Sequence, residues 1–82
     1  MIYQDGKLTV HMSDTSGKPH RVDGPAVKNA IYQGWYINGK LHREDGPAVI
    51  HINTQVCEWW TDGEFILSDK MEQKQIDGWL EK

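Results

Sequence analysis

The chain lacks several features that define common functional classes. It has one cysteine, Cys57, so no disulfide can form within it. No apolar run approaches the ~18–20 residues that a membrane-spanning helix needs, and no basic segment followed by an apolar one opens the sequence. These absences predict a cytoplasmic protein without a membrane partner.

A surplus of positive charge is also lacking. Nine Lys and Arg residues face twelve Asp and Glu residues, for a formal net charge of -3. The acidic excess lies in residues 54–82, which hold seven acidic and three basic side chains. Nucleic-acid binding usually depends on a basic surface, so this composition argues against a nucleic-acid partner. At 82 residues we expect a single domain with a modest core.

Two nearly identical octets are present instead: HRVDGPAV at 20–27 and HREDGPAV at 42–49, here called the first and second corner. A catalytic motif is normally needed once, so the duplication indicates a structural repeat. Turn-forming dipeptides also recur, at Asp5-Gly6, Ser16-Gly17, Asn38-Gly39 and Asp62-Gly63. The chain therefore divides into about three units of 22–24 residues, with degraded outer units that cap the array.

The segments between the turns have strand character. KLTVHMS and AVIHIN alternate apolar and polar residues, and NAIYQGWYI and QVCEWWT are rich in aromatic and β-branched residues. Gly34 inside one of these segments predicts a bulge or bend. The predicted fold is mainly β, a curled antiparallel meander of repeat hairpins over residues 1–66.

The end of the chain loses this alternation and predicts one C-terminal helix over residues 67–82. Ser68 or Asp69 suits the N-cap. One side of the helix would carry Met71, Ile76, Trp79 and Leu80, and the other Lys70, Lys74, Asp77 and Glu81. Such a helix can cover only one face of the sheet.

The stretch YQGWYINGKLHREDGPAVIH resembles the HRxDGPA tandem repeat of uncharacterised phage, viral and bacterial proteins, which is related to MORN-like β-hairpin repeats. GEFILSDKMEQKQIDGWL is similar to the strand and short helix that end such arrays. The resemblance covers about residues 14–80. It implies an interaction role without catalytic residues. The phage occurrence implies a host-directed, anti-defence or antitoxin-like activity in the host cytoplasm.

Every residue type of a corner has a structural role. We expect the aspartates to close turns, the glycines to adopt positive φ, the prolines to begin strands, and the arginines to form ion pairs across the turn. The residues concerned are Asp23, Gly24, Pro25, Asp45, Gly46 and Pro47, with Arg21 and Arg43.

Four sharper interpretations compete with a purely structural one. Trp35, Trp59 and Trp60 could anchor a protein partner, and His20, Arg21, His42 and Arg43, with Lys18 and Lys40, form a locally basic rim suited to a nucleotide or other anion. Hydrolysis by His, Asp and Arg would need convergent groups around a pocket, which two corners in a row do not predict. His11, His20, His42, His51 and Cys57 lack the spacing of a metal site.

The sequence thus predicts a non-enzymatic interaction protein without metal or cofactor, which binds and inhibits or neutralises a protein partner. The alternative is a sequestering protein that binds an anionic ligand at the His/Arg rim. Because apolar residues fall on both faces and a meander has two open edges, we also expect the helix-free face or an edge to meet another chain, most simply in a homodimer.

Overall fold

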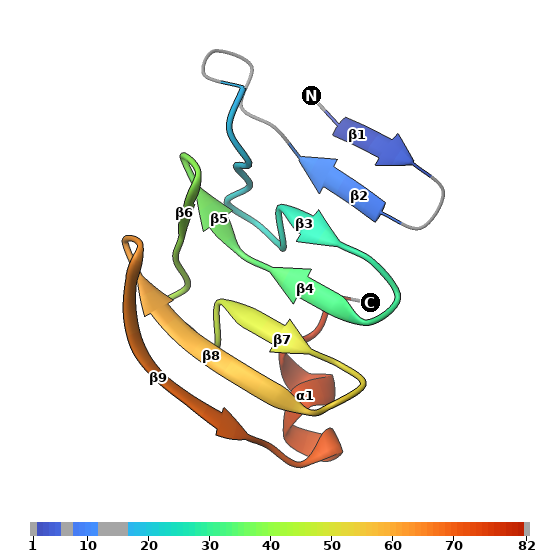
Figure 1. The fold of residues 1–82 in the computed structure, drawn as a ribbon, viewed down its shortest axis with the longest axis vertical. Coiled ribbons are helices and arrows are strands. Elements are labelled where there is room, and N and C mark those ends of the chain that lie inside the picture. Colours follow the sequence, from blue (N-terminus) through green and yellow to red (C-terminus); the bar gives the residue numbers. More distant parts are fainter. Residues whose placement is uncertain (1, 6–7, 12–16, 82) are drawn as a thin grey trace.

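A seven-stranded antiparallel sheet and one short helix make up the fold (Figure 1). The computed structural model describes residues 2–5, 8–11 and 17–81. In spatial order the sheet contains β1 (Ile2–Asp5), β2 (Leu8–His11), β3 (Val27–Lys28), β4 (Tyr32–Gly34), β7 (Val49–His51), β8 (Val56–Thr61) and β9 (Glu64–Lys70). A separate hairpin joins β5 (Tyr36–Ile37) to β6 (Lys40–Leu41), and α1 spans Gln73–Trp79. The predicted antiparallel meander with one C-terminal helix is therefore confirmed, and the sheet does not close into a barrel.

The two-residue turns at Asn38-Gly39 and Asp62-Gly63 form as predicted. Asn38 and Asp62 have φ of 50°, and the glycines that follow each have φ of 81°. Both loop positions thus lie in the left-handed region, which matches the twist of a tight hairpin. The strand partners Ile37–Lys40 and Thr61–Glu64 close these loops.

The first hairpin is shifted by one residue from the predicted turn at Asp5-Gly6. Asp5 pairs with Leu8, so the connecting residues are 6 and 7, which lie outside the described part of the chain. Met12 and Ser16 also lie outside it, so the predicted turn at Ser16-Gly17 is only partly described; Gly17 has a positive φ of 66°.

The bend predicted at Gly34 separates two strands. β4 ends at this residue and β5 begins at Tyr36. A Cβ atom on Gly34 would lie 2.6 Å from the hydroxyl of Tyr32 and 2.9 Å from the ring of Tyr36. The glycine is therefore needed because two aromatic side chains close over the backbone.

The helix prediction was wrong at its start. Residues 64–70 form β9, which pairs with β8 as far as Val56–Lys70. The tight turn at Asp62-Gly63 fixes this pairing, and the strand ladder outweighs the helical pattern of the local sequence. The helix starts after Glu72, which forms a capping box with Gln75, and neither Ser68 nor Asp69 is the N-cap.

The helix covers one face of the sheet, over β7 and β8 (Figure 1). Trp35, Ile50, Cys57 and Ile76 form the buried core. Ile52, Trp59, Met71, Trp79 and Leu80 pack around it, half-buried. The apolar side predicted for the helix is thus confirmed, although the helix itself ends at Trp79. Burial raises the pKa of the Cys57 thiol, which keeps this lone cysteine protonated in the core.

Candidate functional site

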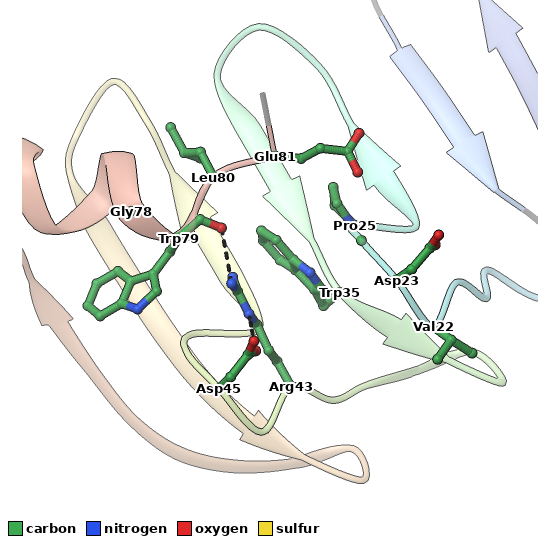
Figure 2. A pocket seen from close by; sticks show the side chains of 11 residues that line it. Val22, Asp23, Pro25, Trp35, Arg43, Asp45, Gly78, Trp79, Leu80 and Glu81 are labelled. Atoms are coloured by element: carbon green, nitrogen blue, oxygen red, sulfur yellow. Dashed lines mark hydrogen bonds and ion pairs between the residues drawn. The ribbon is translucent and has the colours of Figure 1, made fainter.

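Each corner is organised by its arginine, which bonds in three directions. In the second corner, Arg43 Nε donates to Asp45 Oδ1 at 2.9 Å, Nη1 to the Pro47 carbonyl at 3.2 Å, and Nη2 to the Trp79 carbonyl at 3.1 Å. Figure 2 shows the first and third of these bonds. The predicted ion pair across the turn is confirmed, and one donor of the guanidinium points away from the corner.

The first corner repeats this geometry. Arg21 Nε donates to Asp23 Oδ1 at 3.0 Å and Nη1 to the Pro25 carbonyl at 3.3 Å. Its Nη2 lies 2.8 Å from Glu81 Oε2. Pairing with the arginine lowers the pKa of Asp23, and Arg43 does the same for Asp45. These local bonds are the same in both corners, so the repeated sequence builds a repeated structure.

The histidines of the corners support the neighbouring hairpins. His20 Nδ1 accepts a hydrogen bond from the Asn38 backbone N–H, and His42 Nδ1 accepts one from that of Asp62, both at 3.0 Å. Each histidine therefore holds the left-handed residue of the turn in the following unit. An Nδ1 that accepts is unprotonated, so this role requires the neutral imidazole with its proton on Nε2.

The lysines of the basic rim also contact these turns. A Cβ on Gly39 would lie 3.0 Å from the Lys18 side chain, and a Cβ on Gly63 would lie 3.5 Å from that of Lys40. The alkyl chains thus lie over the hairpins while their ammonium groups remain near solvent. All six residues of the rim serve contacts within the chain.

The corner glycines differ from the prediction, because neither Gly24 nor Gly46 has a positive φ. They are needed for close packing. A Cβ on Gly46 would lie 2.9 Å from Trp79 Cδ1, and one on Gly24 would overlap the carboxylate of Glu81. Both glycines therefore make room for residues that follow α1 or end it.

Residues 78–81, here called the strap, run across both corners. Gln33 is the buried polar side chain of the sheet, 3% exposed, and its amide pairs with the backbone of Glu81. The Glu81 N–H donates to Gln33 Oε1 at 2.9 Å, and Gln33 Nε2 donates to the Glu81 carbonyl at 3.3 Å. The carboxylate of Glu81 also lies 3.4 Å from Lys28 Nζ. The sequence placed Glu81 on the solvent side of a helix, and that prediction was wrong.

An open cavity of about 330 Å³ lies beside the strap (Figure 2). Its charged lining combines Arg43 with Asp23, Asp45 and Glu81. Three carboxylates surround one guanidinium that is already bonded to the chain. The cavity is thus unsuited to a nucleotide or another anion.

The aromatic residues beneath the arginines are not equivalent. Arg43 Cζ lies 3.9 Å from the centroid of the Trp35 ring, a cation–π contact. His11 occupies the matching position near Arg21, with 3.4 Å between His11 Nε2 and Arg21 Nη1. The backbone confirms the match, since the N–H groups of His11 and Trp35 donate to Ala26 and Ala48. The repeat alignment missed His11, because the loop between it and Arg21 has a different length.

The helix-free face carries an unbroken set of side-chain contacts across β5, β4, β7, β8 and β9, here called the aromatic band. Its members are Tyr36, Tyr32, His51, Glu58, Trp60 and Phe65. The hydroxyls of Tyr36 and Tyr32 lie 3.3 Å apart, and the rings of Tyr32 and His51 are 5.6 Å apart. Burial, together with the neighbouring Tyr36 hydroxyl, raises the pKa of Tyr32.

Glu58 links the two halves of the aromatic band. Its carboxylate lies 3.2 Å from His51 Nε2 and accepts a hydrogen bond of 2.9 Å from Trp60 Nε1. The Trp60 ring then meets Phe65 edge-on, with 5.3 Å between centroids. The polar groups of the band therefore bond to one another: Tyr32 to Tyr36, and Glu58 to both His51 and Trp60.

The band ends at an open edge of the sheet. All seven residues of β9 are exposed, including the consecutive apolar residues Phe65, Ile66 and Leu67, which are 55%, 56% and 46% exposed. The register with β8 shifts beside Trp59 and Trp60, which leaves Ile66 as the extra residue of a bulge. The sequence prediction did not single out these three residues, because it assigned Leu67 and the following residues to the helix.

The structure separates the three tryptophans predicted to bind. Trp35 is 8% exposed and belongs to the core. Trp59 packs edge-on against Trp79 under the helix, with 5.8 Å between ring centroids. Trp60 lies half-buried on the helix-free face. Of the three, Trp60 is therefore the one that lies on the helix-free face.

The described part of the chain contains no group of three or more His, Cys, Asp or Glu residues placed to hold a metal ion. Among the same residues, no helix has the length and apolar character needed to cross a membrane. Comparison with protein-family models, curated proteins and solved structures finds no match to this chain.

Proposed function

We propose that this is a non-enzymatic interaction protein that binds a protein partner with the aromatic band and the adjoining edge of β9. The observation that carries the proposal is the exposure of Phe65, Ile66 and Leu67 on β9, whose outer edge pairs with no other strand in the described part of the chain; Phe65 lies opposite Trp60 on the helix-free face. Exposed apolar surface of this kind is characteristic of protein interfaces. An open edge can in addition pair with an extended segment of a partner.

The side chains of the band support this use. Tyrosine, tryptophan and phenylalanine bury large areas and lose little conformational entropy on binding. The internal bonds of Glu58 hold Trp60 in place before a partner arrives. Preorganisation of this kind lowers the entropy lost on association.

Acidic side chains accompany the edge. Asp62, Glu64 and Asp69 are exposed in or next to β9, and the segment 54–82 carries the acidic excess of the chain. A partner with a basic rim around an apolar centre would complement this surface. The bonds already made by both corner arginines disfavour the alternative function, capture of an anion at the rim.

A comparison of exposed apolar residues tests the proposal. The paired substitution Phe65→Ser and Ile66→Ser should weaken partner binding about 30-fold, because a loss of about 1 kcal/mol at each of two interface residues adds up to about 2 kcal/mol. Val22→Ser is the matched control, since Val22 is 80% exposed but lies at the first corner. Affinity capture from host lysate identifies the partner, and calorimetry with the purified partner then measures both variants.

A partner that binds both variants equally well would contradict the proposal, as would nucleotide binding that is abolished by Arg21→Ala with Arg43→Ala. Inhibition or neutralisation of that partner, a cytoplasmic location and membership of the HRxDGPA repeat family remain predictions from the sequence.

A further inference from the structure

The strap has the contacts of a bound peptide. The Trp79 carbonyl accepts a hydrogen bond from Arg43 Nη2. The backbone N–H and carbonyl of Glu81 both pair with the side-chain amide of Gln33, and the Glu81 carboxylate forms an ion pair with Arg21 Nη2. We propose that the groove across the two corners is a binding site for a segment of another protein with an aromatic residue followed two positions later by an acidic one, and that the strap occupies this site within the chain.

The spacing of the donors supports this interpretation. Each corner uses Nε and Nη1 of its arginine internally and presents Nη2 outward. The outward donors of Arg43 and Arg21 meet residues 79 and 81, which are two positions apart. The duplicated corner thus forms a row of two oriented cationic donors, one for the carbonyl of the last helical residue, Trp79, and one for the carboxylate of Glu81.

Recognition in the groove has a part that depends on the backbone and a part that depends on side chains. Gln33 pairs with an N–H and a carbonyl, groups that any extended segment except one with proline at that position provides. Arg21 and Lys28 select a carboxylate at the position of Glu81. Trp59 selects an aromatic ring at the position of Trp79, which it meets edge-on.

The corner glycines make the groove accessible to such a segment. Gly46 allows the ring of Trp79 to approach the backbone, and Gly24 does the same for the carboxylate of Glu81. Both are buried or half-buried by these contacts. The requirement for glycine in the corners therefore arises from what lies in the groove, because neither glycine has a positive φ.

Release of the strap would undo the end of α1 but leave the start of the helix in place. Ile76 in α1 is fully buried and anchors the helix to the sheet. Gly78 directly precedes Trp79, the residue that packs on Trp59. This glycine is exposed, and a Cβ built on it would meet nothing within 4 Å. The strap can thus leave the corners only when Trp79 and Leu80 unpack from the core and the end of α1 unwinds, while Ile76 still holds the start of the helix on the sheet.

A capped peptide with the sequence Gly-Trp-Leu-Glu is the probe, and the receptor is the full chain carrying Trp79→Ala and Glu81→Ala, whose strap competes poorly. Titration followed by the side-chain amide signals of Gln33 should show saturable binding. The unaltered chain should bind the peptide at least tenfold more weakly, because its own strap is present at an effective concentration of about millimolar.

A double-substitution cycle tests the contact with Arg21. Replacement of Glu by Gln in the peptide should weaken binding about tenfold when Arg21 is present, since a charge-assisted bond is lost. The same replacement should have no effect on a receptor that also carries Arg21→Gln. Lys40→Gln is the matched control, because Lys40 lies on the rim but away from the strap, beside the Gly63 turn.

Absence of binding at millimolar peptide by the folded receptor would overturn the proposal, and so would binding that ignores both Arg21 and the peptide carboxylate. If the double substitution prevents folding, Glu81→Ala alone serves as receptor, because it keeps Trp79 packed on Trp59. A spectrum of the unaltered chain that changes with protein concentration, without a response to the peptide, would assign the groove to the strap of a second copy and also overturn the proposal.

Discussion

The two corners differ in one sequence position, Val22 against Glu44, yet they are buried to different degrees. The Arg43 side chain is 10% exposed, stacked on Trp35 and bonded to the backbone of the strap. The Arg21 side chain is 22% exposed and lies beside His11, with a flexible carboxylate as its outer partner. The local bonds of the arginines are the same, and the neighbours are not.

This difference separates what a repeated sequence fixes from what its position in the fold adds. The bonds from each arginine to its aspartate and proline carbonyl are made within five residues. Burial depends on elements far away in the chain, such as the strap and the core beneath it. The second corner should therefore contribute more to stability, although both corners have the same internal geometry.

Loss of the arginine should have the largest effect. Arg43→Ala should lower the free energy of unfolding by about 3 kcal/mol, because it uncovers Trp35 and leaves buried acceptors unpaired. Arg21→Ala should lower it by about 1 kcal/mol, since water can replace the more exposed guanidinium. Urea denaturation measures both. Equal losses would show that the corners act independently of their position.

A methyl group on the corner glycines should have the next largest effect. Gly46→Ala forces the new Cβ against Trp79, whose ring is held by Trp59, and should cost about 2 kcal/mol. Gly24→Ala meets the ends of Arg21 and Glu81, which can rotate away, and should cost about 1 kcal/mol or less. Thermal denaturation of both variants tests this order. A larger loss of stability for Gly24→Ala would show that the side chains of Arg21 and Glu81 are held more rigidly than the ring of Trp79.

Removal of the aspartates should have a smaller effect. Asp45→Ala leaves a nearly buried Arg43 without its carboxylate and should cost about 1 kcal/mol. Asp23→Ala should cost less, because Glu81 still pairs with Arg21. Raising the salt concentration should reduce the second loss more than the first. A loss of function in Asp45→Ala with unchanged stability would instead identify the corner as a binding site.

The sequence predicted much of this fold because its strongest signals are local. Asn38-Gly39 and Asp62-Gly63 set the hairpins, and alternation placed Ile50 and His51 on opposite faces. The corner ion pairs also follow from a spacing of two residues. Such features depend on neighbours within a few positions, so a short stretch of sequence contains the information for them.

The features that the sequence did not predict depend on contacts between distant segments. The pairing of Val56 with Lys70 converted the start of the predicted helix into β9. Gln33 and Glu81 are 48 positions apart, and neither belongs to a recognisable motif. The helix prediction then placed Glu81 in solvent, because a helical pattern continued past Trp79 would turn it away from the sheet.

The smallest expected effect concerns pH, and it distinguishes the corners through His11. Burial and the nearby charge of Arg21 lower the pKa of this histidine below 6.5, while the carboxylates of Glu81 and Asp23 oppose the shift. When the pH falls below the ordinary pKa of histidine, His11 binds a proton more readily in the unfolded chain than in the folded chain. The contribution of His11 to stability is thus complete above pH 6.5 and decreases as the pH falls below that value. Trp35 holds the matching place at the second corner and carries no titrating proton.

His11→Trp would give the first corner the arrangement of the second. Urea denaturation between about pH 8 and pH 5 should show a shallower loss of stability in this variant than in the unaltered chain, because one group with a lowered pKa is gone. His20, His42 and His51 are present in both proteins, so their contributions cancel in the difference. The ring of the new tryptophan should also stack on Arg21 and raise stability slightly at neutral pH. Identical pH profiles would show that His11 is solvated and that the charge of Arg21 does not lower its pKa. The two corners would then differ in burial alone.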